Sequence, residues 1–236
     1  MLKTLDLNQV MVVDIETVPQ YQSFTELPPH FQDLWDKKTH FQRKPEQSPD
    51  EFYERAGILA EFGKVICISV GFFNLQNELS LRIKSFYGHN ESVILNQFSA
   101  LLEKNGKRDI LCAHNGKEFD YPYLCRRMLI NGIEIPKLLQ LAGKKPWEVN
   151  HLDIMELWKF GDHKHYTSLS LLAAIFNIPT PKDDIDGNMV RTVYYDEQNL
   201  DRIVTYCQKD VITTAQILLK FKGMEIISPE NITIVS

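Results

Sequence analysis

The sequence predicts an α/β fold with a mixed five-stranded sheet and helices on both of its faces. An apolar run at 10–17, rich in β-branched residues, indicates a buried central strand. Two more β-rich runs, at 64–73 and 79–87, flank a short polar turn and indicate an antiparallel hairpin. After residue 90, helical and strand-like spacing of apolar residues alternate, which is typical of a sheet covered by helices.

Size and composition indicate a single globular domain over 1–236, because 44% of the 236 residues are hydrophobic. No stretch reaches the roughly eighteen apolar residues of a membrane span, so we expect a soluble, cytoplasmic protein without membrane contact. The four cysteines lack a C-x-x-C spacing, which favours reduced core thiols. The net charge of −5 argues against binding nucleic acid by bulk charge, but not against local binding of a strand end.

The first strand, in the sequence VMVVDIET, ends in two acidic residues, Asp14 and Glu16. Successive side chains on a strand point to opposite faces, so both carboxylates lie on one side while Ile15 faces the core. Two close like charges repel unless a cation lies between them, and a divalent cation with oxygen ligands is the economical candidate. From this segment alone, the acids could equally be the polar end of a strand.

The segment 18–62 contains five prolines and many aromatic residues. It is too aromatic for a flexible linker and too broken for one regular element, so we expect an ordered, partly helical excursion from the domain. Ser48, Pro49 and Glu51 predict a helix start with a capping box, and Gly63 is the expected stop.

The remaining elements follow from apolar periodicity and end signals. Helices are predicted at 92–103, 119–130, 168–177 and 199–222, and short strands at 109–113 and 151–153. No element is predicted for the last residues, 228–236.

A further acidic residue, Asp120, follows the strand predicted at 109–113. Asp120 lies where this strand gives way to a helix, with Asn115 and Phe119 before it. Open α/β sheets place ligands at such strand ends. Asp120 alone could also cap the helix, and Asn115 could be only a turn former.

The last predicted helix carries a third polar pair, Tyr206 and Asp210. The two residues are four apart, so they share one face of the helix. Val204, Cys207 and Val211 form the apolar face, which keeps Asp210 near the core, where a carboxylate needs a partner. Spacing alone leaves a structural Tyr–Asp pair as the alternative.

Taken together, DIET, HNGKEFD and YCQKD resemble the three motifs of the DEDD superfamily of metal-dependent 3′–5′ exonucleases, which have a ribonuclease H-like fold. Tyr206 and Asp210 match the Y-x-x-x-D motif of its tyrosine-type branch, whereas the histidine-type branch would have histidine in place of Thr205. The chain is most similar to the exonuclease domain of family B DNA polymerases and to stand-alone bacterial predicted exonucleases related to it. The resemblance runs over about 10–219.

The resemblance implies a site and a reaction. Asp14, Glu16, Asp120 and Asp210 correspond to acids that bind two Mg²⁺ or Mn²⁺ ions, and Tyr206 to a tyrosine that orients water. Thr17 and Asn115 are the expected contacts to the terminal nucleotide. The expected reaction is hydrolysis of the terminal phosphodiester of single-stranded or frayed DNA, with release of mononucleotides.

Two alternatives stay open at this point. A tyrosine-type 3′–5′ exoribonuclease would have the same motifs, because recognition of the 2′-hydroxyl depends on pocket shape. A catalytically inactive nucleic-acid-binding domain is less consistent with the presence of all four acids and the tyrosine. The expected partner is the 3′ end of a nucleic acid, and a replication or repair protein is a further candidate, because a polymerase domain has no counterpart in the sequence.

Overall fold

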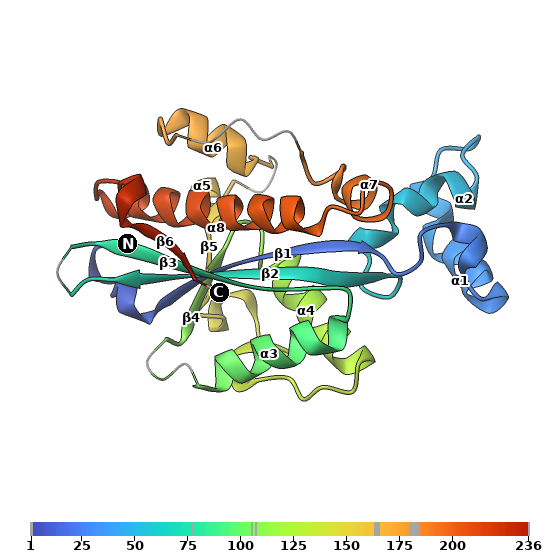
Figure 1. Cartoon of the computed structure of the whole chain (residues 1–236), viewed down its shortest axis with the longest axis horizontal. Helices are drawn as coiled ribbons and strands as arrows, with labels where there is room; N and C mark the ends of the chain where they lie inside the picture. The colour runs from blue at the N-terminus through green and yellow to red at the C-terminus, as the bar shows by residue number, and fades with distance from the viewer. Residues whose placement is uncertain are drawn as a thin grey trace.

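The computed structural model of the chain describes residues 2–76, 78–104, 106, 108–162, 166–179 and 185–235. They form a six-stranded sheet in the order β5-β4-β1-β2-β3-β6, with helices on both faces (Figure 1). The strands are β1 (Val10–Pro19), β2 (Gly63–Asn74), β3 (Ser80–Tyr87), β4 (Ile110–Ala113), β5 (Leu152–Asp153) and β6 (Ile232–Val235). β1, β2 and β3 pair antiparallel, whereas β4, β5 and β6 join by parallel pairs, so the predicted mixed sheet is confirmed.

The sheet has one strand more than the sequence predicts. The additional strand is β6, which pairs with β3, becomes the edge of the sheet and lies in a segment with no predicted element. Its four residues are exposed or half-buried, so they carry no buried alternation that could mark a strand. The expectation of five strands was therefore wrong by this short edge strand.

The helices divide between the two faces of the sheet. In Figure 1, α8 crosses one face, and α3 and α4 cover the other. The α-helices are α1 (Pro29–Thr39), α2 (Pro49–Phe52), α3 (Glu91–Lys104), α4 (Asp120–Ile130), α5 (Ile154–Lys159), α6 (Leu169–Ile175), α7 (Val190–Tyr195) and α8 (Leu200–Lys222). In the described part of the chain, no helix has both the length and the apolar character to cross a bilayer.

β1 is the central strand, and its alternation assigns a face to each of its side chains. Met11, Val13 and Ile15 belong to the core under α3 and α4. Val10 and Val12 belong to the core under α8. Asp14 and Glu16 continue this second, even-numbered row, so the acidic residues emerge on the face that α8 covers.

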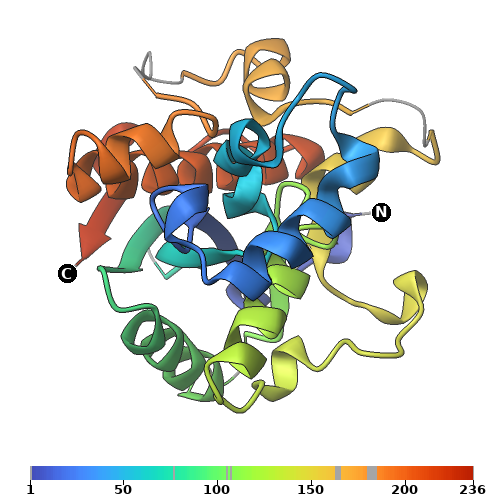
Figure 2. The same cartoon turned by 90° about the vertical axis from the view of Figure 1, so that its right-hand side faces the viewer.

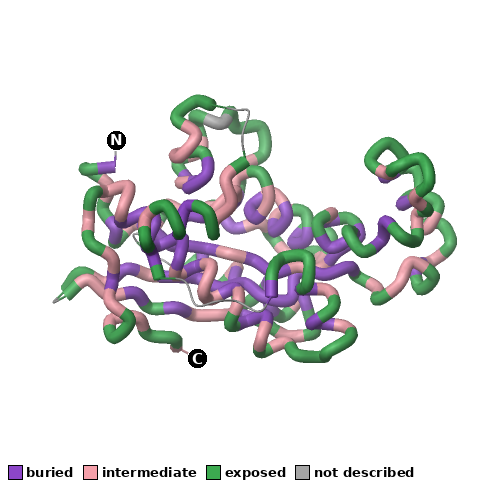
Figure 3. Tube along the Cα trace, turned by 90° about the horizontal axis from the view of Figure 1, so that it is seen from above, coloured by how far each residue is buried: buried purple, intermediate pink, exposed green. Residues whose placement is uncertain are grey.

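The segment 18–62 forms a partly helical excursion at one end of the molecule, with α1, α2 and the 3₁₀ helix η5 (Tyr53–Ile58). It has its own aromatic cluster around the fully buried Trp35. Figure 3 shows buried residues along the strands and mostly exposed residues at this end of the molecule. The capping box at Ser48 is present, but the α-helix ends at Phe52, and Gly63 starts β2 instead of ending a helix.

Candidate active site

The acids of β1 lie under α8 in a poorly hydrated position. Glu16 is buried, and the Oδ2 atom of Asp14 is buried with no hydrogen-bond partner among the described residues. Burial, followed by the charge of Asp210, raises the pKa of both carboxyls well above their usual range. Among the described residues, no hydrogen-bond donor therefore compensates this buried oxygen of Asp14.

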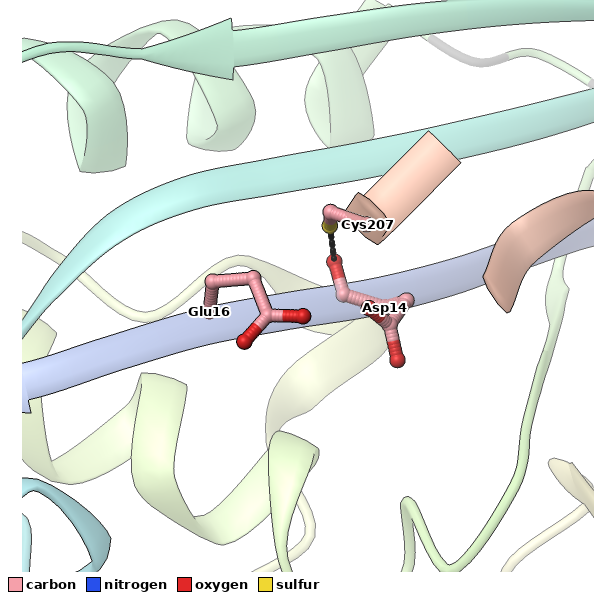
Figure 4. A group of neighbouring side chains, drawn as sticks. All are labelled: Asp14, Glu16 and Cys207. Atoms are coloured by element: carbon pink, nitrogen blue, oxygen red, sulfur yellow. Dashed lines mark hydrogen bonds between the residues drawn. The ribbon is translucent and has the colours of Figure 1, made fainter. Parts of the chain in front are cut away.

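α8 brings Tyr206 and Asp210 to the same place. The helix packs closely on the sheet because β2 has a glycine beneath it: a Cβ on Gly71 would lie 2.7 Å from Val211. The Cys207 thiol donates to the main-chain oxygen of Asp14 at 3.5 Å (Figure 4). This contact joins the helix to the strand one residue from Tyr206.

Asp120 is the first residue of α4, and its side chain is buried. Burial raises its pKa to about 7, although the backbone N–H groups of Asp120 and Ile15 hydrogen bond to the carboxyl and act in the opposite direction. Asp120 lies in the first turn of α4, where a carboxylate complements the helix dipole as the capping alternative had it, although the N-cap residue itself is Phe119.

One cavity of about 580 Å³ collects most of the residues predicted from the sequence. Its walls include Asp14, Glu16, Asn115, Asp120, Tyr206 and Asp210. We call it the acid cavity. Four carboxylates and one phenol from three distant segments therefore face the same space.

Thr17 is the predicted site residue that does not line the acid cavity. Its hydroxyl donates to the main-chain oxygen of Gly57 at 2.8 Å and so holds η5 against β1. Its side chain lines a neighbouring cavity, together with Arg55 and Arg191. The two cavities meet at Ile15, Glu16 and Phe119, which line both.

Asn115 lines the acid cavity from a strained turn. Its φ of 63° lies in the left-handed region, and its side-chain Oδ1 is buried with no hydrogen-bond partner among the described residues. The residue is thus a turn former, as the alternative had it, and it also presents an unsatisfied acceptor beside the acids.

Asp153, which is not among the predicted site residues, supports this turn. Its carboxylate accepts from the backbone N–H groups of Asn115 (3.0 Å) and Lys117 (3.1 Å). It also caps α5 through Met155 (3.0 Å) and Glu156 (3.3 Å). Its only signal in the sequence is its place between a strand and a helix, which suits a cap as well as a supporting role beside the site, and the structure shows both contacts.

The donor set fits divalent cations that prefer oxygen. The Asp14 and Glu16 carboxylates and the Cys207 thiol lie with one potential ligand atom each within 4.8 Å of one another. Burial raises the pKa of the Cys207 thiol, so it keeps its proton and is not expected to act as a thiolate ligand. The carboxylates remain as the ligands, and carboxylate oxygens are typical of Mg²⁺ and Mn²⁺ sites.

Comparison with known proteins relates this arrangement to nucleases. Residues 58–230 match the family of predicted 3′–5′ exonucleases related to the exonuclease domain of PolB. The match begins after β1, so Asp14 and Glu16 lie outside it. The chain is also similar to a DNA polymerase of Pyrococcus glycovorans, with 24% identity over 130 residues, or 50% of this chain and 16% of that polymerase.

A solved structure gives the same result at the level of the fold. The family B DNA polymerase of the hyperthermophilic archaeon Pyrobaculum calidifontis superposes with a TM-score of 0.56 and 16% identity, over 90% of this chain and 24% of that one. The chain thus spans less than a quarter of the length of either polymerase. The expected α/β, ribonuclease H-like fold class is confirmed, with six strands in place of five.

Proposed function

Because the chain belongs to the family of predicted 3′–5′ exonucleases related to the exonuclease domain of PolB, we propose that its acid cavity removes mononucleotides from the 3′ end of single-stranded or frayed DNA. One observation carries the assignment to this cavity. Asp14, Glu16, Asp120 and Asp210 converge there with Tyr206, although they come from three segments far apart in the sequence.

The four carboxylates would hold two divalent ions, Mg²⁺ or Mn²⁺. The fit rests on the buried Asp14 oxygen, to which no described residue donates, and on the raised pKa values of Asp14, Glu16 and Asp120, because a cation relieves both conditions. Bound in a pair, such ions stabilise the attacking water and the departing 3′ oxygen of a phosphodiester.

Tyr206 orients the attacking water and does not act as a base. Burial, the neighbouring acids and a hydrogen bond to Asp210 raise the pKa of its phenol, so the hydroxyl keeps its proton at any physiological pH. A protonated phenol can both donate to a carboxylate and accept from water. Its place on the wall between Glu16 and Asp210 is suited to hold a water against the scissile phosphate.

Asn115 is the proposed contact to the terminal nucleotide, because its free acceptor faces the acid cavity. Thr17 is proposed to hold the backbone of η5 in place and not to contact the nucleotide through its hydroxyl, because that hydroxyl already donates to the main-chain oxygen of Gly57. A single strand should be the better substrate, because a paired end costs a few kcal/mol of unpairing and unstacking before it can enter.

Degradation of 5′-labelled strands tests the proposal. Matched DNA and RNA oligonucleotides are incubated with Mg²⁺, Mn²⁺ or chelator, and closed circular DNA serves as a substrate without ends. We expect a ladder that shortens from the 3′ end, mononucleotide products and no reaction in chelator. Cleavage of closed circles, or shortening from the 5′ end, would contradict the assignment. Faster degradation of RNA than of DNA would make the enzyme an exoribonuclease.

A further inference from the structure

A basic groove lies beside the acid cavity on the outer side of α4. It has a volume of about 750 Å³, and its rim carries Lys117, Arg126 and Lys144, with no carboxylate among its lining residues. Its floor is apolar and includes Leu129 and Leu139.

Two of the three cations of this groove are available to a ligand. Arg126 and Lys144 are exposed and form no ion pair in the described part of the chain. Lys117 is paired with Glu156 at 2.7 Å. Exposed cations with free rotation gain by neutralising phosphates, because counterions are released from the nucleic acid.

An exposed tryptophan lies in the segment that joins two residues of the groove. Trp147 lies between the groove residues Lys144 and Val149, and 76% of its surface is exposed. The Nζ atom of Lys145 lies 5.3 Å from the centre of its ring. A large exposed indole next to lysines is the arrangement on which unpaired bases stack while the phosphates meet the cations.

The groove and the acid cavity share no lining residue, but the loop that follows β4 contributes to both. Lys117 lines the groove, and Asn115 and Phe119, two residues away on either side, line the acid cavity. In Figure 2 the segment between α4 and β5, drawn in yellow-green to yellow, runs out on the side of the sheet that α4 covers. A strand whose 3′ end lies in the acid cavity would pass over this loop to reach the groove.

We propose that the basic groove binds the single strand upstream of the scissile phosphate. Arg126, Lys144 and Lys145 contact its phosphates, and Trp147 stacks on one of its bases. The inference rests on the proposed function, because the strand's end must lie in the acid cavity. An acidic peptide with apolar side chains would share part of this chemistry, but the exposed indole and the loop that lines both the groove and the acid cavity favour the strand.

The test compares binding and hydrolysis on substrates of two lengths. Fluorescence anisotropy in chelator measures the affinity for a labelled oligothymidylate of about twenty nucleotides, and hydrolysis of a thymidine dinucleotide in Mn²⁺ measures the chemistry alone. The variants are a triple replacement of Arg126, Lys144 and Lys145 by alanine and the single Trp147→Ala. The matched control replaces Lys3, Arg82 and Lys104, which are exposed cations outside the groove.

We expect the triple variant to bind the long strand at least 10-fold more weakly, with the slope of log affinity against log salt smaller by about 2, since each phosphate contact on a single strand contributes about 0.7. Trp147→Ala should lose about 5-fold or more, the lower end for one stacked base. Both should hydrolyse the dinucleotide at the wild-type rate, and the control variant should match the wild type throughout.

Unchanged affinity and salt slope in the triple variant would overturn the inference, and so would an equal loss in the control. Strand binding that survives while binding of an aspartate- and leucine-rich peptide is lost would assign the groove to a protein partner. Should the triple variant fail to fold in a thermal melt, Trp147→Ala decides alone. A wild type that binds the strand through the groove but hydrolyses neither substrate would contradict the proposed function and leave the groove assignment standing.

Discussion

Two groups of buried carboxylates in this molecule differ in how their charge is compensated. Glu91 is buried on α3 and receives a two-point contact from Arg127, at 2.8 Å from Nε and 2.6 Å from Nη2. Asn131 and the backbone N–H of Val65 donate to it as well. Its lone pairs are therefore engaged by groups that the chain supplies.

The acid cavity presents the opposite case. Glu16 and Asp120 are as buried as Glu91, and Asp14 is partly buried, yet the Asp14 Oδ2 atom has no donor among the described residues, and the charges of its neighbours raise its pKa further. In the described part of the chain, Asp14 has no counterpart of the Arg127 that pairs with Glu91. The difference indicates that Glu91 serves stability and that the acid cavity is shaped for a cation from outside.

Asp14→Ala should have the largest effect, because Asp14 lies among all the other acids. We expect loss of detectable hydrolysis and weaker Mn²⁺ binding, with a metal-free protein at least as stable as the wild type, since one of several repelling charges is gone. Asp109→Ala, at an exposed aspartate before β4, is the control. Metal titration and a thermal melt check both variants, and unchanged metal affinity in Asp14→Ala would remove Asp14 from the ligand set.

Tyr206→Phe separates catalysis from metal binding on one helix face. The change deletes only the hydroxyl, so the rate should fall by about 10²–10⁴-fold, or less if the group only orients water, while metal affinity is kept. Asp210→Asn removes an anionic ligand and should lower both. Steady-state rates and Mn²⁺ affinity are measured on each variant, and full activity of Tyr206→Phe at every pH would make Tyr206 a packing residue.

Arg127→Ala tests the other side of the comparison. Removal of one partner from a buried ion pair costs about 3–5 kcal/mol of the free energy of unfolding. For a chain of this size, Tm then falls by about 6–20 °C. The exposed neighbour change Arg126→Ala should stay within about 0.5 kcal/mol. If Mn²⁺ restored the stability of Arg127→Ala beyond its effect on the wild type, the Glu91 centre would be coupled to the acid cavity.

The pH dependence of the metal-free protein should show the smallest effect. The pKa of Asp120 rises from 3.8 to about 7 on folding, and those of Asp14 and Glu16 rise as well, so the folded state binds more protons than the unfolded one. The stabilising contribution of Asp120 is complete below about pH 4 and is lost as the pH rises through about 7. Melting in chelator at pH 5.5 and pH 8 should show a larger drop in Tm for the wild type than for Asp120→Asn. Equal drops would mean that Asp120 does not carry this proton.

Local patterns in the sequence were sufficient to predict which of the candidate site residues share one face of a strand or helix. The alternation of β1 placed Asp14 and Glu16 on one face, and the four-residue spacing in α8 placed Tyr206 beside Asp210. These inferences hold because strand and helix periods are local properties.

Contacts between distant segments were beyond such reasoning. Asp153 reaches Asn115 across 38 positions, and Thr17 reaches Gly57 across 40, so neither partner is visible in a local pattern. The Glu91–Arg127 pair and the four-residue β6 are of the same kind, because their signals arise only after the chain has folded. Tertiary partners, and with them the exact set of side chains free to meet a ligand, therefore required the structure.

Calorimetric titration of the metal-free wild type with Mn²⁺ tests the central claim most directly, that bound cations compensate the Asp14 carboxylate, whose Oδ2 atom has no hydrogen-bond partner among the described residues. At pH 7 we expect two ions per chain and a release of protons, seen as a dependence of the heat on the buffer, because the carboxyls with raised pKa must ionise to bind. Asp14→Ala should take up fewer ions with less proton release, and a change at Glu91 should alter neither. A wild type that binds no ion, or one that binds ions identically to Asp14→Ala, would contradict the account.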